Sequence, residues 1–112
     1  YSRHPKPVRF LGDSLERLRE FPRDVRHDAG LQIDRLQHGQ QPDDFKPMRS
    51  VGSGVEEMRI RGTAGAFRLI YTARMVDMIC IIHVFQKKSR TTSRRDLNIA
   101  KARFSSLMGN RT

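Results

Sequence analysis

Hydrophobic and polar residues alternate in the second half of the chain. Residues 55–61 place Met58 and Ile60 on one side and charged residues on the other, and residues 67–73 alternate in the same way. Residues 78–85 are apolar on both sides. A period of two is typical of β-strands, and a run that is apolar on both sides indicates a central strand. Because the connections between these runs are short, we expect antiparallel pairing.

Two other segments have the periodicity of helices, with apolar residues at three- and four-residue steps. Residues 13–38 contain two such stretches, interrupted by a Phe-Pro step, and predict a pair of short helices. A final amphipathic helix is expected after Ser93. Two pairs have the spacing of a helix-starting capping box, and they are Asp13 with Glu16 and Ser93 with Asp96.

The remaining segments complete the predicted fold. Residues 8–11 form a short apolar run that suits an edge strand, and residues 40–54 are rich in Gly, Pro, Ser and Asp and predict a loop. The resulting order is β-α-α-β-β-β-α, an α+β fold with a small antiparallel sheet and helices packed on one face. We expect one domain over residues 1–112, with residues 1–7 as a flexible N-terminal extension.

Composition limits the class of protein. The chain has 112 residues, of which 37% are hydrophobic and 30% charged, which suits one small globular domain. Its one cysteine, Cys80, lies in the most apolar run, so it is expected to be a core thiol in a reducing compartment. No apolar stretch is long enough to cross a bilayer, and the N-terminal residues lack the apolar core of a signal peptide. We therefore expect a soluble, cytoplasmic domain that does not span a membrane.

The net charge of +10 is unevenly distributed. Residues 1–45 hold eight Lys or Arg and eight Asp or Glu, whereas residues 46–112 hold the other 14 cations and only four anions. Such asymmetry indicates an anionic partner, which could be nucleic acid, an acidic membrane or an acidic protein segment. A generically basic surface without a specific partner is the alternative.

Several kinds of catalytic site find no support in the sequence. The four histidines are scattered without ligand spacing and there is a single cysteine, so we expect no metal site. No glycine-rich phosphate loop follows a strand, and no other cofactor site is predicted. The acidic pairs Asp43-Asp44 and Glu56-Glu57 do not form an acid/base dyad, because the first lies in a loop and the second points to opposite strand faces.

Cationic side chains remain as the candidates for chemistry. Arg59 and Arg61 share one strand face, and antiparallel pairing brings Arg68 of the next strand near them. Arginines bind phosphate through paired hydrogen bonds and stabilise the extra negative charge of a phosphodiester transition state. RNA can supply its own 2′-hydroxyl as nucleophile, so such a site requires no metal. As a residue of an exposed face, Arg68 is expected to contribute little to stability.

The chain resembles the RelE/HigB superfamily of toxins from toxin–antitoxin systems, and more closely its phage-derived Gp49-like branch. The resemblance covers about residues 8–108. The segments that carry it are Asp-Asp-Phe-Lys-Pro-Met (43–48), Glu-Met-Arg-Ile-Arg (57–61), Gly-Ala-Phe-Arg-Leu-Ile-Tyr (65–71), His-Val-Phe-Gln-Lys-Lys (83–88) and Thr-Thr-Ser-Arg-Arg-Asp (91–96).

The resemblance implies the toxin of a type II toxin–antitoxin pair. Such a toxin is an mRNA interferase, a metal-independent endoribonuclease that cuts mRNA in the ribosomal A site through attack of the 2′-hydroxyl. The implied partners are mRNA on the ribosome, the 16S rRNA surface and a HigA-like helix-turn-helix antitoxin, with operator DNA bound only through the antitoxin. No membrane partner is expected.

By position, Arg68 matches the catalytic arginine of RelE, and Lys88 falls where a strand-end arginine lies. RelE has a tyrosine after that strand and this sequence has none there, which leaves the acid/base role open to His83, Lys87 or Lys88. The predicted catalytic residues are Arg61, Arg68, Lys88 and His83. The predicted RNA-binding residues are Lys46, Arg59, Lys87, Arg90, Arg94 and Arg95.

Two other functions fit the same scaffold. A ParE-like inhibitor of gyrase would not need the arginine cluster and would depend on the C-terminal region. A non-catalytic module that binds RNA or the ribosome would need positive charge but no single essential arginine.

Overall fold

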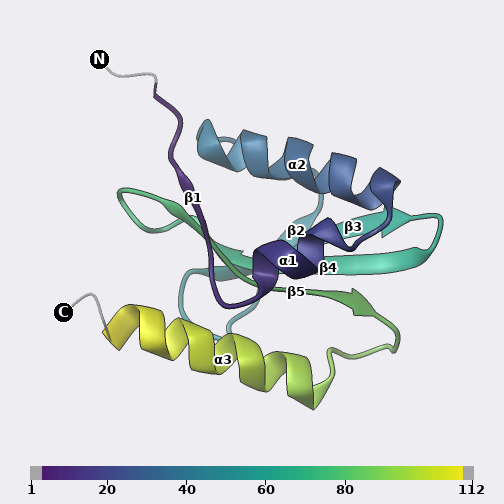
Figure 1. Ribbon diagram of the computed structural model, residues 1–112. Coiled ribbons are helices and arrows are strands. Elements are labelled where there is room, and N and C mark those ends of the chain that lie inside the picture. The colour runs from purple at the N-terminus through teal and green to yellow at the C-terminus, as the bar shows by residue number, and fades with distance from the viewer. Residues whose placement is uncertain (1–3, 110–112) are drawn as a thin grey trace.

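A computed structural model describes residues 4–109 of the protein. The elements are β1 (Val8–Phe10), α1 (Ser14–Arg19), α2 (Arg23–Gln37), β2 (Phe45–Pro47), β3 (Val55–Gly62), β4 (Gly65–Thr72), β5 (Ile79–Lys87) and α3 (Arg94–Gly109). The five strands form one sheet in the order β1-β5-β4-β3-β2 (Figure 1). The predicted α+β class is confirmed.

The three strands predicted in the second half of the chain are present and pair in the predicted antiparallel sense. β3 and β4 form a hairpin, and β4 pairs with β5 on its other side. β5 lies between β4 and β1, so the strand that is apolar on both sides has a neighbour on each edge. A register shift between Ile70 and Tyr71 marks a bulge in the β4–β5 ladder.

The sheet is mixed, which corrects the prediction of an antiparallel sheet. β1 runs parallel to β5, with Val8 opposite Ile79 and Phe10 opposite Ile81. Short connections impose antiparallel pairing only on strands that follow one another in the chain. Because β1 and β5 are distant in sequence, no short connection dictates their relative direction.

A short strand, β2, lies within the segment that was predicted to be a loop. Phe45–Pro47 pairs antiparallel with the stretch from Glu56 to Met58 of β3 and forms the edge of the sheet. A three-residue strand is too short to show alternation, and a proline is tolerated only at such an edge. The neighbouring Gly, Pro and Asp residues therefore obscured it.

The helices pack on both faces of the sheet, and the prediction of helices on one face is wrong. In Figure 1, α2 lies above the sheet and α3 lies below it. Leu18 of α1 and Val25 and Ile33 of α2 pack with one set of sheet residues, and Ala100 and Leu107 of α3 pack with another. The apolar residues on both faces of β5 explain the arrangement, because helices must cover each face to remove these side chains from water.

The two predicted capping boxes have different outcomes. Ser93 caps α3, because its hydroxyl oxygen accepts a hydrogen bond from the Asp96 backbone N–H at 3.1 Å. Asp13 makes no side-chain cap at α1. Its carboxylate instead accepts a hydrogen bond of 2.7 Å from Arg103 of α3, a partner 90 residues away that local spacing cannot reveal.

Part of the predicted N-terminal extension is attached to the domain. The Lys6 backbone N–H donates to the Gln37 carbonyl at 3.0 Å, and the Ile79 N–H donates to the Pro7 carbonyl at 2.9 Å. Residues 1–3 of that extension lie outside the described residues. Among residues 4–109, no helix has the length and apolar character needed to cross a membrane.

Candidate functional site

Five cationic side chains project from the same face of the sheet, the face against which α3 packs. Residues directly opposite each other on paired strands point to the same face. Arg59 pairs with Arg68, and Arg68 pairs with Phe85, which packs in the core beneath α3. We call this set the basic sheet face, and it consists of Lys46, Arg59, Arg61, Arg68 and Lys87.

The strand register arranges the other members of the basic sheet face around the two central arginines. Arg61 pairs with Ala66, and Ala66 pairs with Lys87, so these residues form a row next to the row of Arg59 and Arg68. α3 packs mainly on β5 and leaves Arg61 and Lys46 exposed. The face is thus open to a ligand on the β2–β3 side.

A buried carboxylate lies at the base of this face. The Glu57 side chain is only 2% exposed, and its Oε1 atom lies 3.7 Å from Arg68 Nε, 3.8 Å from Arg59 Nε and 3.9 Å from Lys46 Nζ. Asp44, which is much more exposed, lies 3.9 Å from Arg59 Nη1. Cations still outnumber these two carboxylates on the basic sheet face, so its local charge stays positive.

Arg68 is held in place from two sides. Its Nη1 donates a hydrogen bond of 3.1 Å to the Phe67 carbonyl, and its Nε faces Glu57. Burial lowers the pKa of the Arg68 guanidinium and the Glu57 carboxylate opposes that shift, but an arginine stays protonated near neutral pH. The side chain is 12% exposed, so the expectation of an exposed arginine is wrong, and with it goes the reason for expecting a small contribution to stability.

His83 lies inside the protein, with none of its surface exposed. Its Nε2 is 2.7 Å from Asp96 Oδ1 and its Nδ1 is 3.5 Å from Nη1 of Arg103. These partners indicate a neutral ring that donates from Nε2 and accepts at Nδ1. Burial lowers the pKa of His83, although Asp96 opposes the shift. The ring projects from the same sheet face as Arg68, but it is buried under α3, where it binds Asp96 and Arg103.

Lys88 and Arg95 line a cleft that contains no member of the basic sheet face. The cleft runs along the free edge of β5 beyond its pairing with β1, between α1 and the start of α3, and has a volume of about 510 Å³. Phe85 lines the cleft and also pairs with Arg68 in the sheet. This cleft, which we call the β5-edge cleft, therefore adjoins the basic sheet face at the end of β5.

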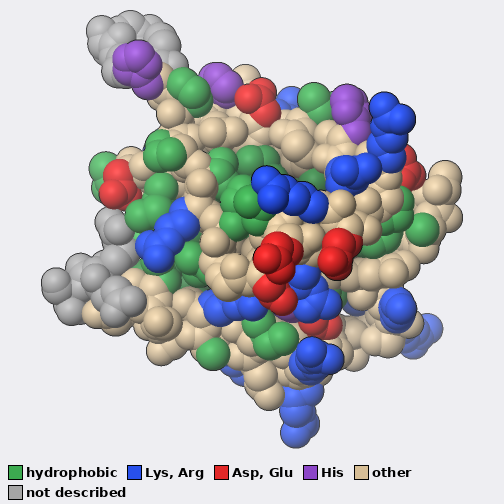
Figure 2. Space-filling model, viewed as in Figure 1, with side chains coloured by type: hydrophobic (Ala, Val, Ile, Leu, Met, Phe, Trp, Pro, Cys, Tyr) green, Lys and Arg blue, Asp and Glu red, His purple; other side chains and the backbone are tan. Residues whose placement is uncertain are grey.

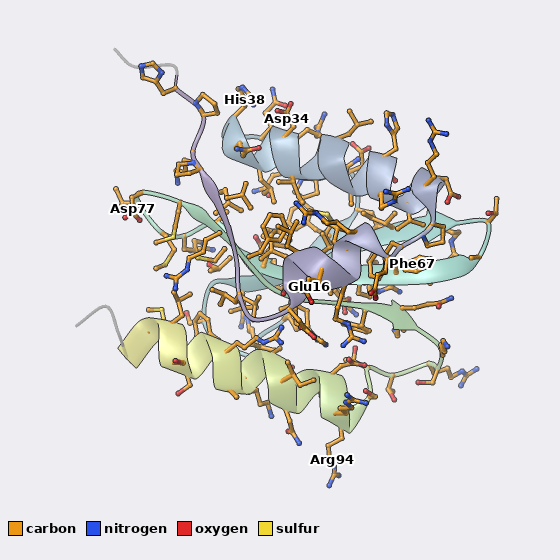
Figure 3. The ribbon with its side chains drawn as sticks, viewed as in Figure 1. Glu16, Asp34, His38, Phe67, Asp77 and Arg94 are labelled. Carbon is orange, nitrogen blue, oxygen red and sulfur yellow. The ribbon has the colours of Figure 1, made fainter. Side chains whose placement is uncertain are left out.

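Arg90 and Arg94 lie further out. Both are exposed, and Figure 3 shows Arg94 pointing away from the sheet at the start of α3. Figure 2 shows Lys and Arg side chains around the part of the surface where β5 ends and α3 begins, with acidic side chains over α1. The ten predicted site residues thus fall into the basic sheet face, the β5-edge cleft with the outer arginines, and the buried His83.

Sequence reasoning missed two residues that organise these sites. Glu57 shares a strand face with Arg59, a signal that was present in the alternation of residues 55–61 but did not show that the carboxylate is buried. Arg103 of α3 bridges Asp13 and the Ile82 carbonyl, and no sequence pattern predicted that contact. Among residues 4–109, no three His, Cys, Asp or Glu side chains come together in a way that could hold a metal ion.

Comparison with models of protein families identifies the family of this chain. The model of the phage-derived protein Gp49-like family matches residues 16–105, which include the basic sheet face and most of α3. The chain belongs to this family. The Gp49-like family is a family of RelE/HigB-like toxins, so the resemblance found in the sequence is confirmed. A comparison with curated proteins finds no match.

Proposed function

We propose that the protein is a toxin that cleaves mRNA in the ribosomal A site as a metal-independent endoribonuclease. The observation that carries this proposal is the basic sheet face, in which Arg59 and Arg68 stand directly opposite each other with Arg61 and Lys87 in the next row. Like charges opposite each other in a sheet are destabilising. A bound phosphodiester would relieve that repulsion, and membership of a toxin–antitoxin-related family supports RNA as its source.

In the proposed reaction the 2′-oxygen of the RNA forms a bond to the adjacent phosphorus while the bond to the 5′-oxygen breaks. The products are a cyclic phosphate and a free 5′-hydroxyl. Negative charge develops on the phosphate oxygens in the transition state, and the guanidinium groups of Arg61 and Arg68 stabilise it there. A prearranged arginine that points at such a charge is typically worth a factor of about 10²–10³ in rate.

The proposed proton transfers need a base at the 2′-hydroxyl and an acid at the leaving oxygen. His83 is fully buried and bound to Asp96, so it is a poor candidate. Lys87 ends β5 in the row of Arg61 and Lys88 follows it, and both remain as candidates. A general acid or base is effective when its proton is within hydrogen-bond reach of the reacting oxygen.

The proposed partners follow from the outer charges and from the family. The exposed Arg90, Arg94 and Arg95 are suited to the phosphates of the 16S rRNA surface, because such contacts are electrostatic and independent of sequence. A HigA-like helix-turn-helix antitoxin would silence the toxin, and operator DNA would be bound only through that antitoxin.

The proposal can be tested with purified protein, translating ribosomes and a defined mRNA, with cuts mapped by primer extension. We expect cuts inside A-site codons, none without ribosomes, and a loss of about 10²-fold or more for Arg61→Ala. Arg26→Ala is the matched control, since Arg26 is also exposed but belongs to α2 on the other face of the sheet. Absence of any cut by the folded protein would refute the proposal and favour a gyrase inhibitor or a binding module.

A further inference from the structure

Glu57 is an unusual residue for the interior of a small sheet protein. Its carboxylate is 2% exposed, and within residues 4–109 its Oε1 has no hydrogen-bond partner. A buried carboxylate is costly unless opposite charges surround it. Glu57 is surrounded by Arg59, Arg68 and Lys46, all members of the basic sheet face.

The geometry of these contacts fixes the orientation of the two arginines. Glu57 approaches both guanidinium groups at Nε, the edge nearest the protein, at 3.8 Å from Arg59 and 3.7 Å from Arg68. The Phe67 carbonyl accepts a hydrogen bond from Nη1 of Arg68. The hydrogen bond to the Phe67 carbonyl and the ion pair with Glu57 together restrict the rotation of the Arg68 guanidinium group.

Glu57 offsets a repulsion between the two arginines. Arg59 and Arg68 are a directly opposed pair in the ladder, and two like charges in that position repel. Asp44 is an inadequate substitute, because its side chain is 60% exposed and its ion pair is with Arg59. The buried carboxylate between the two Nε atoms is therefore the element that keeps the guanidinium groups side by side.

We propose that Glu57 is a positioning residue that holds Arg59 and Arg68 together as a preformed clamp for one phosphodiester of RNA. Glu57 acts from beneath the clamp and does not touch the substrate. The inference rests on the proposed function and adds the residue that makes two repelling arginines act on the same phosphate. Preorganisation of this kind matters because a misplacement of about 1 Å can cost about 10²-fold in rate.

The central experiment compares Glu57→Gln with Glu56→Gln, which removes the same charge from the neighbouring residue on the other strand face. The cleavage rate is measured in a single turnover on the ribosome. Affinity is measured with an mRNA whose A-site codon carries 2′-deoxy sugars and cannot be cut. For Glu57→Gln we expect affinity unchanged or tighter, because a negative charge is lost, with cleavage slower by about 10²-fold. Glu56→Gln should change neither.

A second measurement does not depend on cleavage. In the free protein, nitrogen NMR of the arginine Nε–H groups should show restricted side chains for Arg59 and Arg68, and Glu57→Gln should release them while Glu56→Gln does not. If wild-type protein cuts no RNA but this restriction is found, the proposed function fails and the clamp remains. Wild-type cleavage by Glu57→Gln, or arginine signals that do not respond to it, would overturn the role of Glu57.

A variant that keeps the charge provides a test even if Glu57→Gln does not fold. Glu57→Asp retains a carboxylate but withdraws it by one methylene, so it should fold and cut more slowly than wild type with unchanged affinity for the uncut mRNA. Cleavage by Glu57→Asp at the wild-type rate would also overturn the inference.

Discussion

Replacement of Arg68 by methionine tests whether the Glu57 cluster stabilises the fold. Two opposite unit charges 3.7 Å apart attract by about 4 kcal/mol at an effective dielectric constant of about 20, and by about 1 kcal/mol in water. Loss of one partner of a buried pair costs about 3–5 kcal/mol when the other charge is left alone. The cost should be smaller for Arg68→Met. In this variant Glu57 still has Arg59 and Lys46 as cationic partners, and the repulsion between Arg59 and Arg68 is removed. We therefore expect Arg68→Met to lower the free energy of unfolding by about 2 kcal/mol.

Urea unfolding followed by circular dichroism measures this loss, and a double-mutant cycle isolates its origin. With Glu57→Gln as the second change, the two single losses should exceed the loss of the double variant by about 1–2 kcal/mol, because both remove the same interaction. Arg61→Met is the matched control, since Arg61 is exposed on the same face and should change stability by less than about 0.5 kcal/mol. A strictly additive cycle, or an Arg68→Met variant as stable as wild type, would refute the reasoning.

Three further predictions concern pH, packing and surface charge. Burial lowers the pKa of His83, so protonation of this ring is less favourable in the folded than in the unfolded state. The free energy of unfolding should therefore be at its full value above pH 6.5 and fall as the pH drops below 6.5, and His83→Gln should reduce the accompanying decline in Tm. Gly62→Ala places a Cβ 2.5 Å from Val25 Cγ2 and should cost about 1–3 kcal/mol in urea unfolding, whereas Gly30→Ala, with open space on the exposed side of α2, should stabilise by about 0.5–1 kcal/mol. Arg94→Glu should weaken ribosome binding in a salt series without lowering Tm, because an acidic residue is favourable in the first turn of α3; unchanged binding would exclude Arg94 from the interface.

The strands and helices were predictable because their patterns are local. Alternation placed Met58 and Ile60 on one side and Arg59 and Arg61 on the other, and the structure keeps that division. Helical spacing identified α2, and the relation of Ser93 to Asp96 identified the start of α3. These features depend on residues two to four positions apart, which the sequence displays directly.

The composition of the candidate site was predictable only in part. Short connections between the strands brought Arg59, Arg61 and Arg68 together, as expected from the hairpin. The sequence did not reveal that Glu57 is buried beneath them, because burial depends on side chains contributed by β2, β3 and β4 together. The same limit applied to His83, because its partners Asp96 and Arg103 belong to α3 and come next to the ring only in the folded protein.

The sequence by itself determined which segments are strands and helices, which residues share a strand face and where the net positive charge lies. Only the tertiary structure decided that β1 runs parallel to β5, that α3 covers the face opposite α1 and α2, and that a buried carboxylate joins the arginines. The physical reason is range. Periodicity and capping act between neighbours in the chain, whereas strand direction, coverage of a sheet face and the pairing of buried charges depend on segments that meet only when the whole chain has folded.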